Sequence, residues 1–148
     1  MRLSARSKYA VLAMLELAFQ YDRKYVSVAE LAEKQGISRP FLEKLLLQLK
    51  RAGLTKSQRG PDGGYSLALS PAEICIGDIF TVVDGPVDFT DCFDPPSPSD
   101  VTTFCMSTLL EEIEEGICNV LNANTLQDLC LKARDFKQLP PHVHSFSI

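Results

Sequence analysis

Residues 33–53 read EKQGISRPFLEKLLLQLKRAG, and this stretch decides the fold of the chain. Gly36 is typical of a residue that ends a helix with positive φ, and Ser38 is a favourable cap for the start of another helix. Pro40 is tolerated because it lies in the first helical turn. After it, leucines at helical spacing form one apolar stripe: Leu42, Leu45, Leu46 and Leu49. Two helices joined by a short turn that contains a glycine predict a helix-turn-helix.

The upstream segments predict the first of these two helices and another helix that covers both. The sequence SVAE at residues 27–30 matches a capping box, and Val26 and Leu31 are placed to form a hydrophobic staple. Residues 5–21 predict an amphipathic helix, because small and apolar residues recur there at helical spacing: Ala10, Ala13, Met14, Leu17 and Ala18. This helix can cover the apolar faces of the other two.

Downstream, residues 54–69 predict a β-hairpin. Residues 65–69 alternate polar and apolar side chains, as a half-buried strand does, and residues 58–64 are rich in Gly, Pro and Asp, as a hairpin loop is. A hairpin directly after a recognition helix is a wing, and Arg59 near its tip could enter a narrow minor groove, where the negative potential is enhanced. The expected fold class is mainly α with a small β-hairpin, a winged helix-turn-helix followed by a long dimerisation helix.

Charge is divided unevenly along the chain, whose net charge is −4. Residues 1–70 contain 12 Lys and Arg against 6 Asp and Glu, whereas residues 71–148 contain 3 against 13. A basic half fused to an acidic half indicates two roles, one of them facing a polyanion, although chance segregation of solvated charge gives the same balance. Helical spacing places these side chains outward on the segment after Ser38, where they can contact bases or phosphates: Arg39, Glu43, Lys44, Gln48 and Arg51.

Glu43 is the acidic member of this outward face. Its carboxylate can accept a hydrogen bond from cytosine N4 and so favour certain sites at a cost in affinity. It can equally pair with a nearby lysine on the helix surface. Both interpretations stay open at the level of the sequence.

The second half of the chain predicts further helices and a loop. The sequence SPAE at residues 70–73 matches a capping box and predicts a short helix from there to Gly85. Pro and Asp are frequent in residues 86–100, which predict a loop. From Val101 to Asn122 apolar residues recur every three or four positions, as a helix–helix interface requires: Met106, Leu109, Leu110, Ile113, Ile117, Val120 and Leu121. A final helix begins at Thr125.

These patterns divide the chain into a winged helix-turn-helix domain (1–84), a sensor-type loop (85–100), dimerisation helices (101–136) and a tail (137–148). No apolar run approaches the length that crosses a bilayer, and the start of the chain lacks the apolar segment of a signal peptide. We therefore expect a cytoplasmic protein without membrane contact. Five cysteines in a reducing compartment are core residues, metal ligands or redox groups. Three of them lie on helical patterns and are expected in the core: Cys75, Cys118 and Cys130.

Together these motifs resemble the IscR, NsrR and CymR group of bacterial transcription regulators, the Rrf-two family. The resemblance covers nearly the whole chain, and its most specific part is RGPDGGY at residues 59–65. Supporting segments are MRLS at 1–4, KYA at 8–10, GIS at 36–38 and NTLQDL at 124–129. The resemblance implies a homodimer that binds a palindromic operator in double-stranded DNA. Carried over by position, it implies DNA contacts at Ser4, Lys8, Ser38, Arg39, Phe41, Glu43, Lys44, Arg59, Gly60 and Gly63.

The same resemblance bears on a cofactor, because the sensors of this family hold an iron–sulfur cluster on three cysteines before the long helix. Cys92 and Cys105 lie near the outer two of these positions. Pro98, which cannot ligate, stands near the middle one, and Thr108 stands where the iron–sulfur regulator has a histidine. Two thiolates are too few for a cluster. Three interpretations stay open: a cluster completed by other groups, a redox thiol pair, or no cofactor.

Two functions from other classes compete with DNA binding. A winged helix used only for protein contacts would show no salt-sensitive binding to DNA. A redox or metal enzyme would depend on Cys92 and Cys105, but the sequence offers no catalytic base, nucleotide loop or complete ligand set. The sequence therefore favours a homodimeric regulator that binds DNA and has no enzymatic activity.

Overall fold

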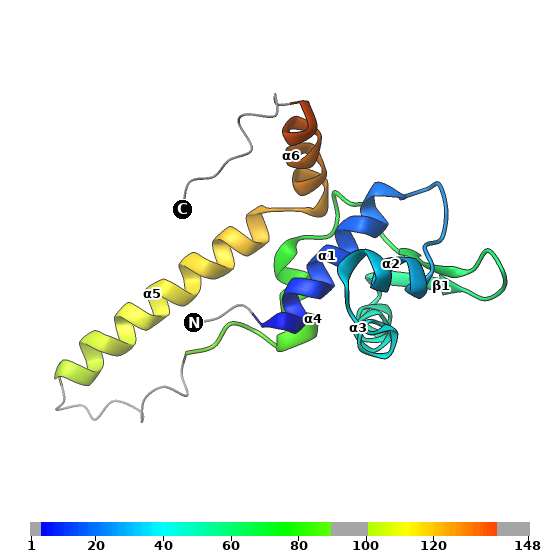
Figure 1. Cartoon of the computed structure of the whole chain (residues 1–148). Helices are drawn as coiled ribbons and strands as arrows, with labels where there is room; N and C mark the ends of the chain where they lie inside the picture. The colour runs from blue at the N-terminus through cyan, green and yellow to red at the C-terminus, as the bar shows by residue number, and fades with distance from the viewer. Residues whose placement is uncertain (1–3, 90–100, 139–148) are drawn as a thin grey trace.

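The computed structural model of the chain describes residues 4–89 and 101–138. Within these ranges the elements are α1 (Ala5–Phe19), α2 (Val28–Gln35), α3 (Arg39–Arg51), β1 (Thr55–Gln58), β2 (Gly64–Leu67), α4 (Ile76–Asp84), α5 (Val101–Ala123) and α6 (Leu126–Gln138). Helices dominate, and β1 and β2 form one antiparallel hairpin (Figure 1). The fold class predicted from the sequence is confirmed.

Local capping signals place the helix-turn-helix where the sequence predicts it. The Ser27 hydroxyl accepts a hydrogen bond from the Glu30 amide at 3.1 Å and begins α2. Gly36 ends α2 in the left-handed conformation, with a φ of 64°. Ser38 occupies the N-cap position of α3, but its side chain makes no capping hydrogen bond. The Ser38 hydroxyl is thus not used by the helix that it precedes.

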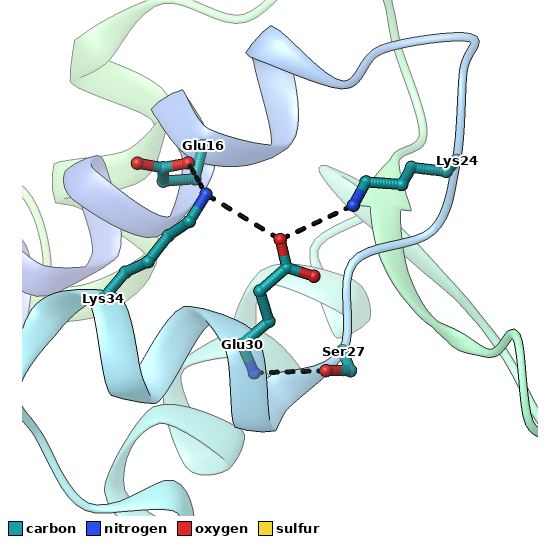
Figure 2. Close-up of polar contacts among 5 residues, drawn as sticks. All are labelled: Glu16, Lys24, Ser27, Glu30 and Lys34. Carbon is teal, nitrogen blue, oxygen red and sulfur yellow. Dashed lines mark hydrogen bonds and ion pairs between the residues drawn. The ribbon is translucent and has the colours of Figure 1, made fainter.

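The Glu30 carboxylate pairs with lysines and does not complete the predicted capping box. Lys34 Nζ lies 2.9 Å from a Glu16 carboxylate oxygen and 3.8 Å from Oε1 of Glu30, and Lys24 Nζ lies 3.5 Å from the same Glu30 oxygen (Figure 2). The hydrogen bond that Lys34 donates to Glu16 is the main cause that raises the pKa of Lys34. Because the Glu30 carboxylate faces two lysines, only the Ser27 half of the predicted capping box forms. Exposed pairs of this kind link α1 to α2 but contribute little stability.

The wing is attached to the segment that precedes α2. In the hairpin Thr55 lies opposite Leu67, and Gln58 lies opposite Gly64. Val26 exchanges two backbone hydrogen bonds with Tyr65, at 2.8 and 2.9 Å, and so extends the sheet by one bridge. A Cβ on Gly64, whose φ is 150°, would overlap the Val26 carbonyl, so this close approach requires glycine.

One hydrophobic core joins elements that are distant in the sequence. Helix α1 lies at its centre and contacts α2, α3, α4, α6 and β2 (Figure 1). Met14 and Leu17 of α1, Ile79 of α4 and the leucine stripe of α3 are all buried. Leu126, the first residue of α6, is fully buried in the same core. Helix α6 therefore packs on α1.

The helix predicted to begin at residue 70 begins later, and that prediction is wrong. Ser70 and Glu73 do make a capping contact, with the Ser70 amide donating to the Glu73 carboxylate at 3.0 Å, but residues 71–73 form only a turn. The backbone then stays extended, because Ile76 N donates to the Asn124 carbonyl at 2.8 Å and Leu126 N donates to the Ile74 carbonyl at 3.0 Å. Pairing with the α5–α6 connection thus delays α4 until Ile76.

Helix α5 is the least covered element of the structure. None of its 23 residues is buried, and it extends away from the packed helices (Figure 1). Three of its four acidic side chains, Glu111, Glu112 and Glu115, and several apolar side chains are exposed. None of the described helices combines the length and apolar character that crossing a membrane would require.

Candidate nucleic-acid interface

Helix α3 has one face in the core and one face in solvent. Four of its leucines, Leu42, Leu45, Leu46 and Leu49, are at most 2% exposed. Of the side chains predicted to point outward, Arg39, Glu43, Lys44 and Arg51 are exposed and Gln48 is half-buried. The helix pattern read from the sequence therefore gives the correct outward face.

The cations of α3 stand on two sides of this outward face. On the wing side, Lys50 Nζ donates to the Ser57 hydroxyl of β1 at 2.6 Å, and Arg39 shares that side, three helical turns earlier. On the α1 side, Lys44 and Arg51 line a shallow hollow of about 320 Å³ between α1 and α3. Between the two basic sides runs a row without cations, made of Pro40, Glu43 and Leu47. We call this the central row of α3.

Arg6 also belongs to this basic face, although the sequence did not lead us to predict it there. It lies on α1 and lines the same hollow as Lys44 and Arg51. Its guanidinium donates to Oε1 of Gln48 on α3 at 3.1 Å. The contact joins residues that are far apart in the chain, and only the packing of α1 on α3 brings them together. Its signal in the sequence was its place beside Ser4 and Lys8 at the start of the same helix.

Glu43 forms no ion pair with any residue in the described ranges, so pairing with a helix lysine does not account for it. The carboxylate faces the wing strand β2, where its charge adds to burial, the larger effect, in raising the pKa of Tyr65. An exposed carboxylate between two rows of cations is therefore left available for a ligand that donates hydrogen bonds.

Ser4 and Lys8, the predicted contact residues at the start of α1, differ in their surroundings. Ser4 caps α1 by accepting a hydrogen bond from the Ser7 amide at 3.0 Å, and its hydroxyl donates to Asp84 at the end of α4. Ser7 donates to the same Asp84 carboxylate, so Ser4 helps to hold α1 against α4. Lys8 is exposed, and its Nζ lies 5.4 Å from the centre of the Tyr9 ring.

Phe41 is supported by the same aromatic ring. Its ring meets Tyr9 edge-to-face, with centroids 6.0 Å apart and an interplanar angle of 89°. Phe41 is half-buried, whereas Ser38, which precedes α3, is exposed. The start of α3 therefore presents a free hydroxyl beside a ring whose orientation α1 fixes.

The wing loop exposes Arg59 because its glycines allow a tight turn. Gly60 has a φ of 115°, and its carbonyl accepts a hydrogen bond from the Gly63 amide at 3.0 Å. A Cβ on Gly63 would overlap the Gln58 carbonyl, so a larger residue would open the loop. Arg59, Gly60 and the neighbouring Pro61 and Asp62 are all exposed. The two glycines thus shape the loop that presents the Arg59 side chain.

Only one of the two predicted cysteine ligands lies in the described part of the structure. Cys105 is exposed on α5, and Cys92 lies outside the described residues. No group of three or more His, Cys, Asp or Glu side chains within the described ranges could hold a metal ion. The described residues therefore do not fit an iron–sulfur cluster. Cys75, Cys118 and Cys130 are half-buried, and burial is the main cause that raises the pKa of both Cys75 and Cys130.

The seven side chains predicted for the dimer interface fall into two groups on α5. Met106, Leu109, Ile113 and Val120 are exposed. Leu110, Ile117 and Leu121 are half-buried, and Leu121 packs against the core of the same chain. We call the four exposed residues the apolar row of α5.

Comparison with known proteins gives one consistent result. A family model described as "Rrf2: Iron-dependent Transcriptional regulator" matches residues 3–132. The HTH-type transcriptional regulator IscR of Aliivibrio salmonicida is 38% identical over 129 residues, which cover 87% of this chain and 77% of that protein. The structure of T. potens IscR matches with a TM-score of 0.78 at 33% identity, over 98% of this chain and 97% of that one. The structure of CymR, the global cysteine regulator of B. subtilis, matches with a TM-score of 0.74 at 32% identity, over 87% and 95%.

Proposed function

The chain belongs to the Rrf2 family of DNA-binding transcription regulators, which are not enzymes, and we propose that it binds a palindromic operator as a homodimer. The same proposal places the protein in the cytoplasm, where a bacterial regulator meets its DNA. The described residues by themselves form no iron site, and Cys92, one of the two predicted ligands, lies outside them.

The observation that carries the proposal is the arrangement of charge on α3. A helix in the major groove lies between two phosphate backbones, with its central residues directed at the base edges. The exposed face of α3 has this distribution, because cations flank a central row that has none. We assign Arg39 and Lys50 to one backbone and Lys44, Arg51 and Arg6 to the other.

The remaining predicted contacts take roles that follow from their positions. The free Ser38 hydroxyl at the start of α3 can donate to a phosphate or a base. The unpaired Glu43 carboxylate accepts from cytosine N4, which favours sites with a cytosine at that position. Exposed Arg59 of the wing enters the neighbouring minor groove. Phe41 and Ser4 act mainly on the position of α3 and α1, while Lys8 is exposed and can reach a phosphate.

The apolar row of α5 supports the homodimer that we propose. Its members recur at intervals of three, four and seven residues, which is the spacing of a coiled-coil contact. All four side chains are at least 40% exposed in a single chain. A continuous apolar stripe of this kind is covered in a stable soluble protein, and the same row of a second chain matches it in length and spacing. Two-fold pairing of α5 would present two copies of α3 to one duplex.

Selection from a library of randomised DNA duplexes tests the proposal. The full chain should enrich an inverted repeat whose half-sites are centred about one helical turn, or a multiple of it, apart. An Arg39→Ala/Lys44→Ala variant should lose the enrichment, whereas Arg134→Ala, which removes an exposed cation of α6, should keep it. Absence of any enriched sequence would contradict specific DNA binding. A single, unrepeated half-site would contradict the homodimer.

A further inference from the structure

One leucine of α3 does not take part in the core. Leu47 is 39% exposed, whereas the other four leucines of the helix are at most 2% exposed. It is therefore not one of the residues that hold α3 in place. It lines the hollow that Arg6 and Arg51 share, where the other side chains are Lys44 and Gln48, with Phe41 and Leu45.

The position of Leu47 within α3 indicates which part of a DNA duplex its side chain could contact. It follows Glu43 by one helical turn in the central row, so both side chains point in the same direction from the helix. The cations stand to either side of this row, where phosphates are expected. A residue in the central row faces the base edges instead.

The major groove offers one apolar group that matches a leucine, the C5 methyl of thymine. The other groups on the base edges there are hydrogen-bond donors or acceptors, which an isobutyl group cannot satisfy. Burial of a methyl against a leucine removes apolar surface of both from water. Resting on the proposed function of α3, we propose that Leu47 contacts a thymine methyl and makes thymine a required base of each half-site.

The geometry of the helix also gives the place of this thymine. Four residues of an α-helix rise by about 6 Å, and successive bases of one strand rise by about 3.4 Å. Leu47 therefore contacts a base one or two steps from the base that Glu43 contacts. The enriched half-site should contain a thymine at that distance from the cytosine assigned to Glu43.

Removal of single methyl groups from the DNA tests this inference directly. In the selected duplex each thymine is replaced in turn by deoxyuridine, which lacks only the C5 methyl, and the Kd of the full chain is measured by fluorescence anisotropy. One position per half-site should weaken wild-type binding by about fourfold, the factor for one buried methyl. Leu47→Ala should bind the thymine duplex more weakly, and it should no longer distinguish uridine from thymine at that position.

Two controls make the result specific. Leu131→Ala removes another exposed leucine, on α6, and should keep the full sensitivity to the methyl. Thermal unfolding of Leu47→Ala should match the wild type, since the side chain is not in the core. The inference is overturned if no thymine shows the effect, or if Leu47→Ala keeps it. If the proposed function itself is wrong, the outcome is different, because the protein then binds no duplex specifically.

Discussion

Arg59 shows how a single exposed residue can be tested without disturbing the fold. It stands in the wing loop, and its local backbone is set by Gly60 and Gly63 rather than by its own side chain. Its substitution should therefore change electrostatics and leave packing intact. The same holds for the exposed cations of α3, which project from a helix whose opposite face is buried.

We expect Arg59→Ala to weaken DNA binding and to reduce its dependence on salt. Each phosphate contact that is lost lowers the slope of log K against log salt concentration by about 0.9. Titrations at several salt concentrations measure this slope. Arg134→Ala serves as the charge-matched control and should leave the slope unchanged. A wild-type slope for Arg59→Ala would show that the wing does not contact DNA.

Asp128 provides a prediction on pH. Hydrogen bonds donated by the Thr125 amide and hydroxyl, at 2.8 and 2.7 Å, lower the pKa of this carboxyl below its ordinary value of 3.8. A lowered pKa in the folded state stabilises the fold above the pKa of the unfolded state, and the effect is lost as the pH falls through the folded value. Asp128→Ala should lower Tm at pH 7, and the difference should shrink below pH 3.8.

The control for this measurement is Asp135→Ala, which removes a carboxylate of the same helix outside the cap. Its Tm should stay near the wild-type value at pH 7. A difference between Asp128→Ala and the wild type that is equally large at pH 7 and at pH 3 would contradict the assignment, because it would not depend on the carboxylate charge.

At the scale of elements, a glycine sets the contact between α4 and α5. A Cβ on Gly77 would overlap Oδ1 of Asn122 and lie 3.1 Å from its Cγ. The Asn122 amide oxygen also accepts a hydrogen bond from the Cys75 thiol at 3.7 Å. The end of α5 is thus held in a notch at the start of α4, which in turn packs on α1.

Gly77→Ala should displace the end of the exposed Asn122 side chain and break its hydrogen bond with the Cys75 thiol. The loss of this contact opposes helix propensity, which favours alanine over glycine by about 1 kcal/mol. We therefore expect the free energy of unfolding to change by less than about 1 kcal/mol, as measured by urea unfolding. In the Gly77→Ala/Asn122→Ala double variant the obstacle is removed, so the double variant should be more stable than Asn122→Ala alone. A Gly77→Ala protein destabilised by more than about 2 kcal/mol would contradict this account, because it would mean that the methyl meets a rigid neighbour.

At the scale of the whole molecule, the separation of the two α3 helices depends on how α5 pairs with its copy. Ile113→Glu places a charge in the middle of the apolar row of α5. We expect this variant to sediment as a monomer. Operator affinity should fall by at least about 100-fold, since linked half-sites gain about that much from being bound together.

Asn119→Glu, which adds the same charge to an exposed position of α5 outside the apolar row, should remain a dimer. The comparison separates the position of the charge from the charge itself. A dimeric Ile113→Glu protein with wild-type affinity would mean that another surface pairs the two chains.

Much of the fold follows from the sequence, because its signals are local. Ser27, Gly36 and the leucine spacing of α3 act within a few residues, and they set the helix boundaries wherever no other segment competes. The same is true of the wing, whose glycines permit backbone conformations that other residues avoid. The outward side chains of α3 were also predictable, since helical periodicity alone divides the buried face from the exposed one.

The sequence by itself thus determined the helix-turn-helix, the hairpin and the segregation of basic and acidic residues, all of which depend on short-range order along the chain. Only the tertiary structure decided that Ile74 and Ile76 pair with the α5–α6 connection, that Arg6 joins the α3 face, and that Leu121 turns toward the core. The physical reason is distance along the chain. Backbone pairing and side-chain contact between remote segments outweigh a local capping preference, and they leave no periodic trace in either segment.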